Sequence, residues 1–177
     1  MLFPPKLQRG DTIRVVSPAR SLAIIGQEIR AIAEQRFKEL GLKLTFGSHA
    51  EEKDELNSSS IRSRVDDLHE AFQEKDVKMI ISGIGGFNSH QLLPHLDFNL
   101  IRKNPKIVCG FSDITALNNS ILAKTGLVTY SGTHYSTFGM EHHFDYILDY
   151  FKRCLMSDKE IEVQPISEWT DDLWFID

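Results

Sequence analysis

The chain has 177 residues, and its shares of hydrophobic residues (41%) and charged residues (25%) are typical of globular proteins. This composition excludes a disordered chain, and the length suffices for one domain with a core, or for one domain and part of a second. The 20 basic and 25 acidic residues give a net charge of −5, and without a basic cluster this charge argues against nucleic acid as the main partner.

The first half of the chain predicts two strands, each followed by a helix. A β-branched run at residues 13–16 is typical of a strand, which a proline two residues later ends. Apolar residues recur at helical spacing over residues 22–40, and Gly41 follows as a C-cap. Residues 42–46 alternate between apolar and polar side chains, as a half-buried strand does. The serines before residues 61–72 are N-cap candidates for a second helix.

The middle of the chain predicts strands that are buried on both faces. Residues 79–81 and 106–109 are compact apolar runs without alternation, which is typical of a parallel sheet covered by helices. Each run leads into a tight turn and then into a helix, expected at residues 91–93 and 113–124. Gly126 is expected to end the second of these helices.

The remaining elements complete an alternation of strands and helices. We expect a strand at residues 127–130, a helix at 141–155 and a strand-like alternation at 161–163. This order predicts an α/β fold built on a doubly wound parallel sheet, of the flavodoxin-like or amidotransferase-like type.

The end of the chain suggests the domain organisation. We expect the α/β domain to span residues 1–160, and residues 161–177 to begin a linker toward a C-terminal domain outside this chain. The last residues carry large apolar side chains, Trp169 and Trp174 among them, whereas free termini are usually polar. These two indoles could pack against the further domain or stack on a planar ligand.

The first motif that could carry chemistry is Gly-Phe-Ser-Asp at residues 110–113. A serine on a sharp turn between a buried strand and a helix has its hydroxyl held out of the sheet, as in a nucleophile elbow. The N-terminus of the following helix favours developing negative charge there. The usual Gly-x-Ser-x-Gly pattern is half met, because Ile114 stands in place of the second glycine. Alternatively, Ser112 or Asp113 only caps the helix.

The second motif is the glycine-rich turn at residues 83–89. Paired glycines after a strand let backbone N–H groups approach a ligand closely, so Gly85 and Gly86 could complete an oxyanion hole or cradle a phosphate. The turn matches neither the Gly-x-Gly-x-x-Gly pattern nor a Walker loop. A plain tight turn is the alternative.

A serine nucleophile needs a histidine base, and none of the seven histidines is marked by its context. His134, after the strand expected at residues 127–130, is the best placed, although a loop histidine is the simpler interpretation. His142 and His143 would point about 100° apart on a helix, and their spacing matches no set of metal ligands. We therefore expect neither a metal nor a cofactor.

Cysteine content and hydropathy indicate the compartment. Cys109 and Cys154 are too few for a disulfide framework or a zinc site. No apolar run approaches the ~20 residues that a membrane span needs, and the N-terminus has no secretory signal. We expect a soluble, cytoplasmic protein without a membrane partner.

Taken together, the motifs resemble the LD-carboxypeptidase family of serine peptidases, which includes muramoyl-tetrapeptide carboxypeptidases and microcin C self-immunity peptidases. The resemblance rests on Gly-Gly-Phe-Asn-Ser at residues 85–89 and on Gly-Phe-Ser-Asp-Ile-Thr-Ala-Leu at residues 110–117, at their mutual spacing. Val-Val-Ser-Pro-Ala at residues 15–19 resembles the opening strand and loop of the family. The likeness runs from about residue 3 to residue 175.

The resemblance implies roles for residues of both turns. Ser112 would be the nucleophile toward an amide carbonyl, and backbone N–H groups of Asp113 and of Gly85 or Gly86 would hold the oxyanion. Two features resemble the microcin-immunity branch: Asn88 and Ser89 after the glycines, and the segment with Trp169 and Trp174. Substrates of that branch are peptidyl or aminoacyl nucleotides cleaved at an amide beside a carboxylate-bearing residue. The residues expected to contact such a substrate are Asn88, Ser89, Trp169 and Trp174.

The resemblance also implies partners for this chain. In the family, the glutamate and histidine of the Ser-Glu-His triad belong to a C-terminal domain, and no motif here matches them. We therefore expect an enzyme whose present fragment is inactive alone, with its own C-terminal domain and a peptide or peptidyl-nucleotide substrate as partners. We also expect a homodimer. Gly132 and Thr133 depart from the Gly-Pro that is common in relatives.

A different class of function remains open on the residues alone. The chain could be a non-catalytic α/β binding module, in which the turn at Gly85 and Gly86 holds an anion and Ser112 is a helix cap.

Overall fold

A computed structural model describes residues 1–166 of the chain. Its centre is a five-stranded sheet in which all neighbouring strands are parallel, in the order β2-β1-β3-β4-β5. The predicted doubly wound α/β fold is therefore confirmed. The strands are β1 (Thr12–Val16), β2 (Lys43–Phe46), β3 (Val77–Ser82), β4 (Ile107–Gly110) and β5 (Tyr130–Ser131).

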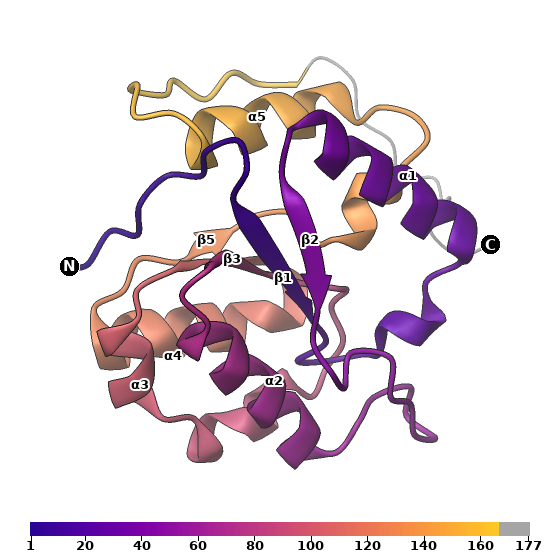
Figure 1. The fold of residues 1–177 in the computed structure, drawn as a ribbon, viewed down its shortest axis with the longest axis vertical. Coiled ribbons are helices and arrows are strands. Elements are labelled where there is room, and N and C mark those ends of the chain that lie inside the picture. The colour runs from indigo at the N-terminus through magenta and orange to yellow at the C-terminus, as the bar shows by residue number, and fades with distance from the viewer. Residues whose placement is uncertain (167–177) are drawn as a thin grey trace.

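Helices cover both faces of the sheet (Figure 1). One face carries α1 (Gln27–Glu39) and α5 (Asp145–Leu155), and the other carries α2 (Ile61–Gln73), α3 (Phe98–Lys103) and α4 (Thr115–Thr125). The short 3-10 helices lie in the connections: η1 (Leu22–Ile24), η2 (Ser89–His95), η3 (Ser112–Ile114) and η4 (Ser136–Gly139).

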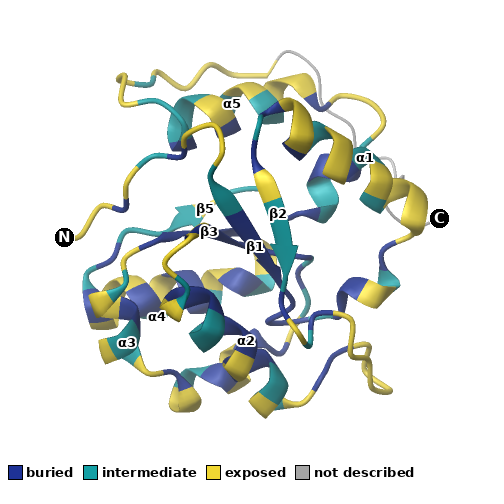
Figure 2. Ribbon diagram, in the orientation of Figure 1, coloured by how far each residue is buried: buried dark blue, intermediate teal, exposed yellow. Residues whose placement is uncertain are grey.

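Each face of the sheet has its own hydrophobic core. In β3, Met79 and Ile81 belong to the core under α1 and α5, whereas Ile80 belongs to the core under α2, α3 and α4. Successive residues of a strand point to opposite faces, so an unbroken apolar run serves both cores. In Figure 2, the inner strands β1 and β3 are mostly buried, whereas the edge strands β2 and β5 are only partly buried.

The order of the strands determines where a ligand could bind. The chain passes from β1 to β2 at one side and returns to β3 on the other side of β1, so the connections after β1 and β3 run to opposite faces. In open α/β sheets, ligands bind in the crevice that forms at the carboxyl ends of strands at such a switch point. Both predicted turns follow strands that end at this edge.

Several helix boundaries differ from the expected ones because of local chemistry. The helix predicted over residues 22–40 is divided, since Gly26 is extended (φ −57°, ψ 148°) and caps α1. Pro94 lies within the segment after β3, which forms a 3-10 helix. The helix expected from residue 141 begins at Asp145. Gly126 does end α4, in the left-handed region with φ +77°.

Two predicted strands are shorter or absent. Only Tyr130–Ser131 forms β5, while Leu127 forms an isolated bridge with Leu2 of the N-terminal segment. The strand expected at residues 161–163 is wrong, because this segment lies along α5 and is held by side-chain hydrogen bonds. The Gln164 carbonyl accepts from the Tyr146 hydroxyl (2.7 Å), and its N–H donates to the Tyr150 oxygen (2.6 Å).

The rest of the expected linker, with Trp169 and Trp174, lies outside the described residues. Among the helices of residues 1–166, none combines the length and apolarity that crossing a bilayer requires.

Candidate active site

Ser112 lies at the carboxyl end of β4 in a strained backbone conformation. Its φ is +57°, in the left-handed region that costs an L-residue roughly 1–2 kcal/mol, and its side chain is exposed. The cap of η3 is Phe111 and the cap of α4 is Ile114, and neither helix has a side-chain cap hydrogen bond. The alternative in which Ser112 or Asp113 caps the helix is therefore wrong.

The glycine turn after β3 packs directly against Ser112. A Cβ atom at Gly85 would lie 3.3 Å from the Ser112 Cβ and 3.4 Å from its Oγ. A Cβ atom at Gly86 would lie only 2.9 Å from the Ala19 Cβ. At Gly86 something would have to move to make room for a side chain, whereas at Gly85 the neighbouring atoms would have to give by only a few tenths of an ångström. Within residues 1–166, neither glycine N–H donates a hydrogen bond.

Asp113 and Ser89 join the two turns to each other. The Ser89 N–H donates to Asp113 Oδ2 (2.9 Å), and the Ser89 hydroxyl donates to the Asp113 carbonyl (2.8 Å). Ser89 is fully buried, and these bonds occupy its polar groups. Its predicted contact with substrate stays a prediction, and the bonds assign it the role of fixing one turn against the other.

Asn88 is also buried, and its Nδ2 donates to the Ser58 hydroxyl (3.0 Å). Its Oδ1 has no hydrogen-bond partner within the described part of the chain. A buried carbonyl without a partner costs free energy, so this oxygen is available to a ligand donor or an ordered water molecule. Its contact with substrate likewise stays a prediction.

His134 supports the backbone next to Ser112 rather than the Ser112 hydroxyl. Its Nε2 lies 3.1 Å from the Phe111 nitrogen and 3.0 Å from the Phe111 oxygen, and its ring stacks on the Phe111 ring at 4.1 Å. Burial lowers the pKa of His134 to about 4, so the ring is neutral at pH 7. Within residues 1–166, no hydrogen bond joins His134 to Ser112.

Arg64, which the sequence analysis missed, ties the loops after β1 and β3 together. This buried guanidinium on α2 donates to the carbonyls of Pro18 and Asn88 (3.2 Å each) and to Gln91 Oε1 (2.9 Å). Burial lowers its pKa, and the charge of Asp113 opposes that shift. The signal in the sequence was an arginine among the apolar positions of the helix predicted at residues 61–72.

The comparison with known families agrees with this geometry. Residues 13–132, which include both turns, match the family described as the LD-carboxypeptidase N-terminal domain. The chain belongs to the LD-carboxypeptidase family. The resemblance inferred from the two turns is thereby confirmed.

Relatives of known sequence extend beyond this LD-carboxypeptidase domain. YocD of Bacillus subtilis, a protein named as a carboxypeptidase, is 52% identical over 99% of this chain, which covers 54% of YocD. The murein tetrapeptide carboxypeptidase of Pseudomonas aeruginosa is 27% identical over 59% of this chain, covering 34% of that enzyme. The chain thus spans about half, or less, of the length of these relatives.

Solved structures in the family share the fold closely. An MccF-like protein from Bacillus anthracis superposes with a TM-score of 0.97 at 57% identity, over 100% of this chain and 54% of that one. The self-immunity protein MccF, solved with glutamyl sulfamoyl guanosine, gives a TM-score of 0.89 at 31% identity, over 96% of this chain and 52% of its own.

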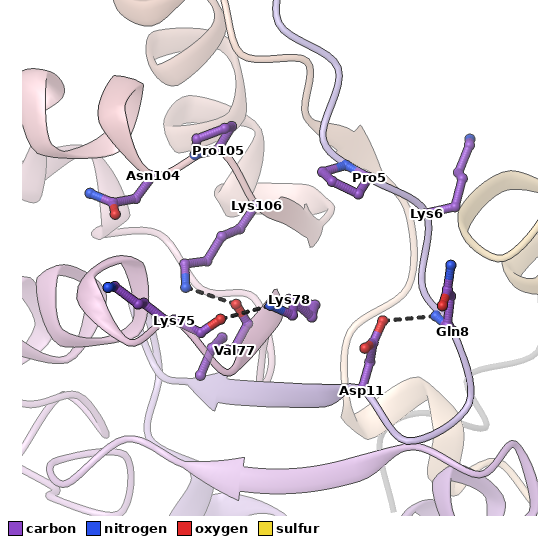
Figure 3. Close-up of a pocket in the computed structure, with 10 residues that line it drawn as sticks. All are labelled: Pro5, Lys6, Gln8, Asp11, Lys75, Val77, Lys78, Asn104, Pro105 and Lys106. Atoms are coloured by element: carbon purple, nitrogen blue, oxygen red, sulfur yellow. Dashed lines mark hydrogen bonds between the residues drawn. The ribbon is translucent and has the colours of Figure 1, made fainter.

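The described cavities of this LD-carboxypeptidase domain lie away from the two turns. The larger one, of about 390 Å³, lies at the opposite edge of the sheet and is lined by four lysines and by Asp11 (Figure 3). Lys106 points its ammonium at the Val77 carbonyl (2.7 Å), Lys6 donates to the Cys154 carbonyl, and Lys78 donates to the Lys75 carbonyl. Three of the four ammonium groups thus donate hydrogen bonds to backbone carbonyls.

The acidic and histidine residues of the domain do not gather into a metal site. Among residues 1–166, no three side chains of His, Cys, Asp or Glu lie close enough to hold a metal ion. His142 and His143 lie in the exposed segment before α5.

Proposed function

We propose that the full-length protein is a serine hydrolase that cleaves an amide bond in a peptide or a peptidyl nucleotide. The observation that carries this proposal is the strained, exposed Ser112 at the end of β4, packed against Gly85. A strained backbone persists only where its surroundings stabilise it, and such residues cluster at active sites. Membership of the LD-carboxypeptidase family supports the same chemistry.

In the proposed mechanism, the Ser112 hydroxyl attacks the carbonyl carbon of the scissile amide. The new C–O bond places a negative charge on the carbonyl oxygen, which the N–H groups of Asp113 and of Gly85 or Gly86 stabilise. Collapse of this intermediate breaks the C–N bond, releases the protonated amine and leaves an acyl-enzyme. Water then hydrolyses the ester and restores the Ser112 hydroxyl.

The proton of Ser112 needs a base, which we place in the part of the protein beyond this chain. The nearby His134 is engaged with Phe111, and a pKa of about 4 makes it a poor base at neutral pH. A histidine oriented by a glutamate in a C-terminal domain would complete the triad. The partial coverage of the relatives, 54% for YocD, supports such a domain.

A covalent probe tests the nucleophile. A fluorophosphonate should label full-length protein once, and Ser112→Ala should abolish labelling and lower kcat by about 10⁴-fold or more. The exposed Ser131, at the end of β5, gives the matched control, and Ser131→Ala should label normally. Normal labelling of Ser112→Ala would place the nucleophile elsewhere, and no labelling of the parent protein would support the alternative, an anion-binding module using the N–H groups of Gly85 and Gly86.

Two compounds distinguish the possible substrate classes. Because MccF was solved with glutamyl sulfamoyl guanosine, and a relative is named as a murein tetrapeptide carboxypeptidase, we propose to compare kcat/KM for both kinds of substrate. If Trp169 or Trp174 stacks on a nucleobase, its replacement by alanine should raise KM for the nucleotide substrate about tenfold or more and leave the murein peptide unaffected. Equal effects on both substrates would indicate packing against the C-terminal domain.

A further inference from the structure

Arg20 lies beside the candidate nucleophile without a role in the mechanism above. It follows β1, at the switch point of the sheet, where ligands of α/β proteins bind. We propose that Arg20 binds the carboxylate of the residue on the leaving side of the scissile amide. This inference rests on the proposed hydrolase function and names the feature of the substrate that the site selects.

Two hydrogen bonds fix Arg20 to the glycine turn. Its Nε donates to the Gly85 carbonyl (3.3 Å), and its backbone N–H approaches the same oxygen (3.4 Å). The Arg20 Cγ lies 3.2 Å from the position of a Cβ at Gly86. The guanidinium is therefore held over the turn by the same residue, Gly85, that contacts Ser112.

The contacts through Gly85 limit how far Arg20 is from the nucleophile. The Ser112 Oγ lies 3.4 Å from the Cβ position of Gly85, and the Gly85 oxygen lies 3.3 Å from the Arg20 Nε. Because a Cβ and the carbonyl oxygen of one residue are about 3 Å apart, Oγ and Nε are at most about 10 Å apart. The terminal nitrogens lie about 2.3 Å from Nε, so they are at most about 12 Å from Oγ.

A carboxypeptidase substrate fits this span. In a C-terminal residue, the scissile carbonyl carbon and the carboxylate carbon are less than about 4 Å apart. An attack distance of about 3 Å, a carboxylate C–O bond of about 1.2 Å and a charge-assisted hydrogen bond of about 2.8 Å bring the total to about 11 Å, close to the upper limit for the terminal nitrogens. One substrate can thus reach Ser112 and Arg20 at the same time.

The charge of Arg20 is available to a ligand. Arg14, Arg30, Arg62 and Arg153 each form an ion pair, whereas Arg20 has no carboxylate within 4 Å in residues 1–166. Of its three guanidinium nitrogens, only Nε donates a hydrogen bond to the described residues, which leaves both terminal nitrogens. A guanidinium fork binds a carboxylate through two parallel hydrogen bonds.

The test measures binding by full-length Ser112→Ala protein, so that it does not depend on catalysis. Calorimetry compares a murein tetrapeptide with its C-terminal amide, which lacks the negative charge. We expect the free acid to bind about 10- to 100-fold more tightly than the amide. Adding Arg20→Met should abolish this preference, and Arg20→Lys should restore part of it.

Controls distinguish recognition from damage to the turn. Arg62→Met removes an arginine whose side chain is 91% exposed on α2, and it should leave the preference unchanged. Equal weakening of both peptides by Arg20→Met, a preference that survives it, or no preference in the parent protein would each overturn the proposal. A failure of Ser112 as nucleophile would appear only in the labelling experiment.

A second arm identifies the anion. Adenosine monophosphate, with which an MccF variant was solved, carries a phosphate beside its nucleoside and no carboxylate. If Arg20 selects the C-terminal carboxylate, Arg20→Met should change the affinity for this compound less than threefold, whereas a loss as large as that for the free-acid peptide would contradict selection of a carboxylate.

Discussion

At the scale of single residues, the geometry at Ser112 depends on a neighbour that has no side chain. Gly85 contacts both Ser112 and His134, and His134 in turn holds Phe111, the residue before the nucleophile. The left-handed backbone of Ser112 is thus held between Gly85 on one side and Phe111, fixed by His134, on the other. A substitution at any of these positions should act through the position of the hydroxyl.

Gly85→Ala should lower kcat of the full-length protein about 10- to 100-fold, because its Cβ would lie 3.2 Å from His134 Cε1 and 3.4 Å from the Ser112 Oγ. Steady-state kinetics on an amide substrate measure this effect. Gly26→Ala is the control, since no atom lies within 4 Å of its Cβ position and its φ is negative. An unchanged kcat in Gly85→Ala would show that the turn can shift to accept a Cβ without displacing Ser112.

The buried ring of His134 should make stability depend on pH. Its pKa in the folded protein is about 4, below the ordinary 6.5, so between these values the unfolded chain binds more protons and stability rises with pH. His134→Gln should remove up to about 3 kcal/mol of that rise. Urea unfolding of the full-length protein at about pH 4 and about pH 7 measures it.

The exposed His142 provides the comparison, and His142→Gln should keep the pH dependence of the parent protein. A parallel profile for His134→Gln and the parent protein would mean that His134 does not titrate differently on folding.

The sequence identified Ser112 and the diglycine turn because short motifs mark positions where the backbone is constrained. It could not identify the partners of these positions. His134, Arg64 and Arg20 act through backbone atoms of segments distant in sequence, and a single chain carries no pattern for such contacts. Ser89 shows the same limit, because its burial depends on how η2 meets η3.

At the scale of elements, the strands were easier to predict than the connections. Apolar runs such as residues 79–81 indicate a buried strand directly, because both faces need apolar side chains. The connections became 3-10 turns and an isolated bridge, which depend on packing against other segments. The tail at residues 161–163 has strand-like alternation, but no strand of residues 1–166 pairs with it.

The end of α4 allows a clean test of backbone conformation. Gly126 has φ +77° with open space around its Cβ position, so Gly126→Ser should cost about 1 kcal/mol of stability through the backbone alone. Gly26 is equally open but has φ −57°, and Gly26→Ser should not destabilise the protein. Urea midpoints compare the two, and equal losses would contradict this account.

At the scale of the whole molecule, the domain carries the candidate nucleophile and anion-stabilising groups but no paired base among residues 1–166. We therefore expect residues 1–177 alone to hydrolyse an amide substrate at least about 10³-fold more slowly than the full-length protein. Parallel assays of both proteins measure the difference. Comparable rates would show that the base lies within this chain. Whether the full-length protein is a homodimer stays a prediction, which light scattering can test.

The N-terminal segment forms backbone hydrogen bonds along one side of the domain. Leu2 exchanges backbone hydrogen bonds with Gly126 and Val128, and the Leu7 N–H donates to the Leu155 carbonyl. The segment therefore covers backbone groups at the side of the sheet where β5 pairs through only two residues. Trimming the first six residues would leave the Gly126 carbonyl and the Val128 N–H open to pairing between molecules, so a shortened protein should self-associate on concentration.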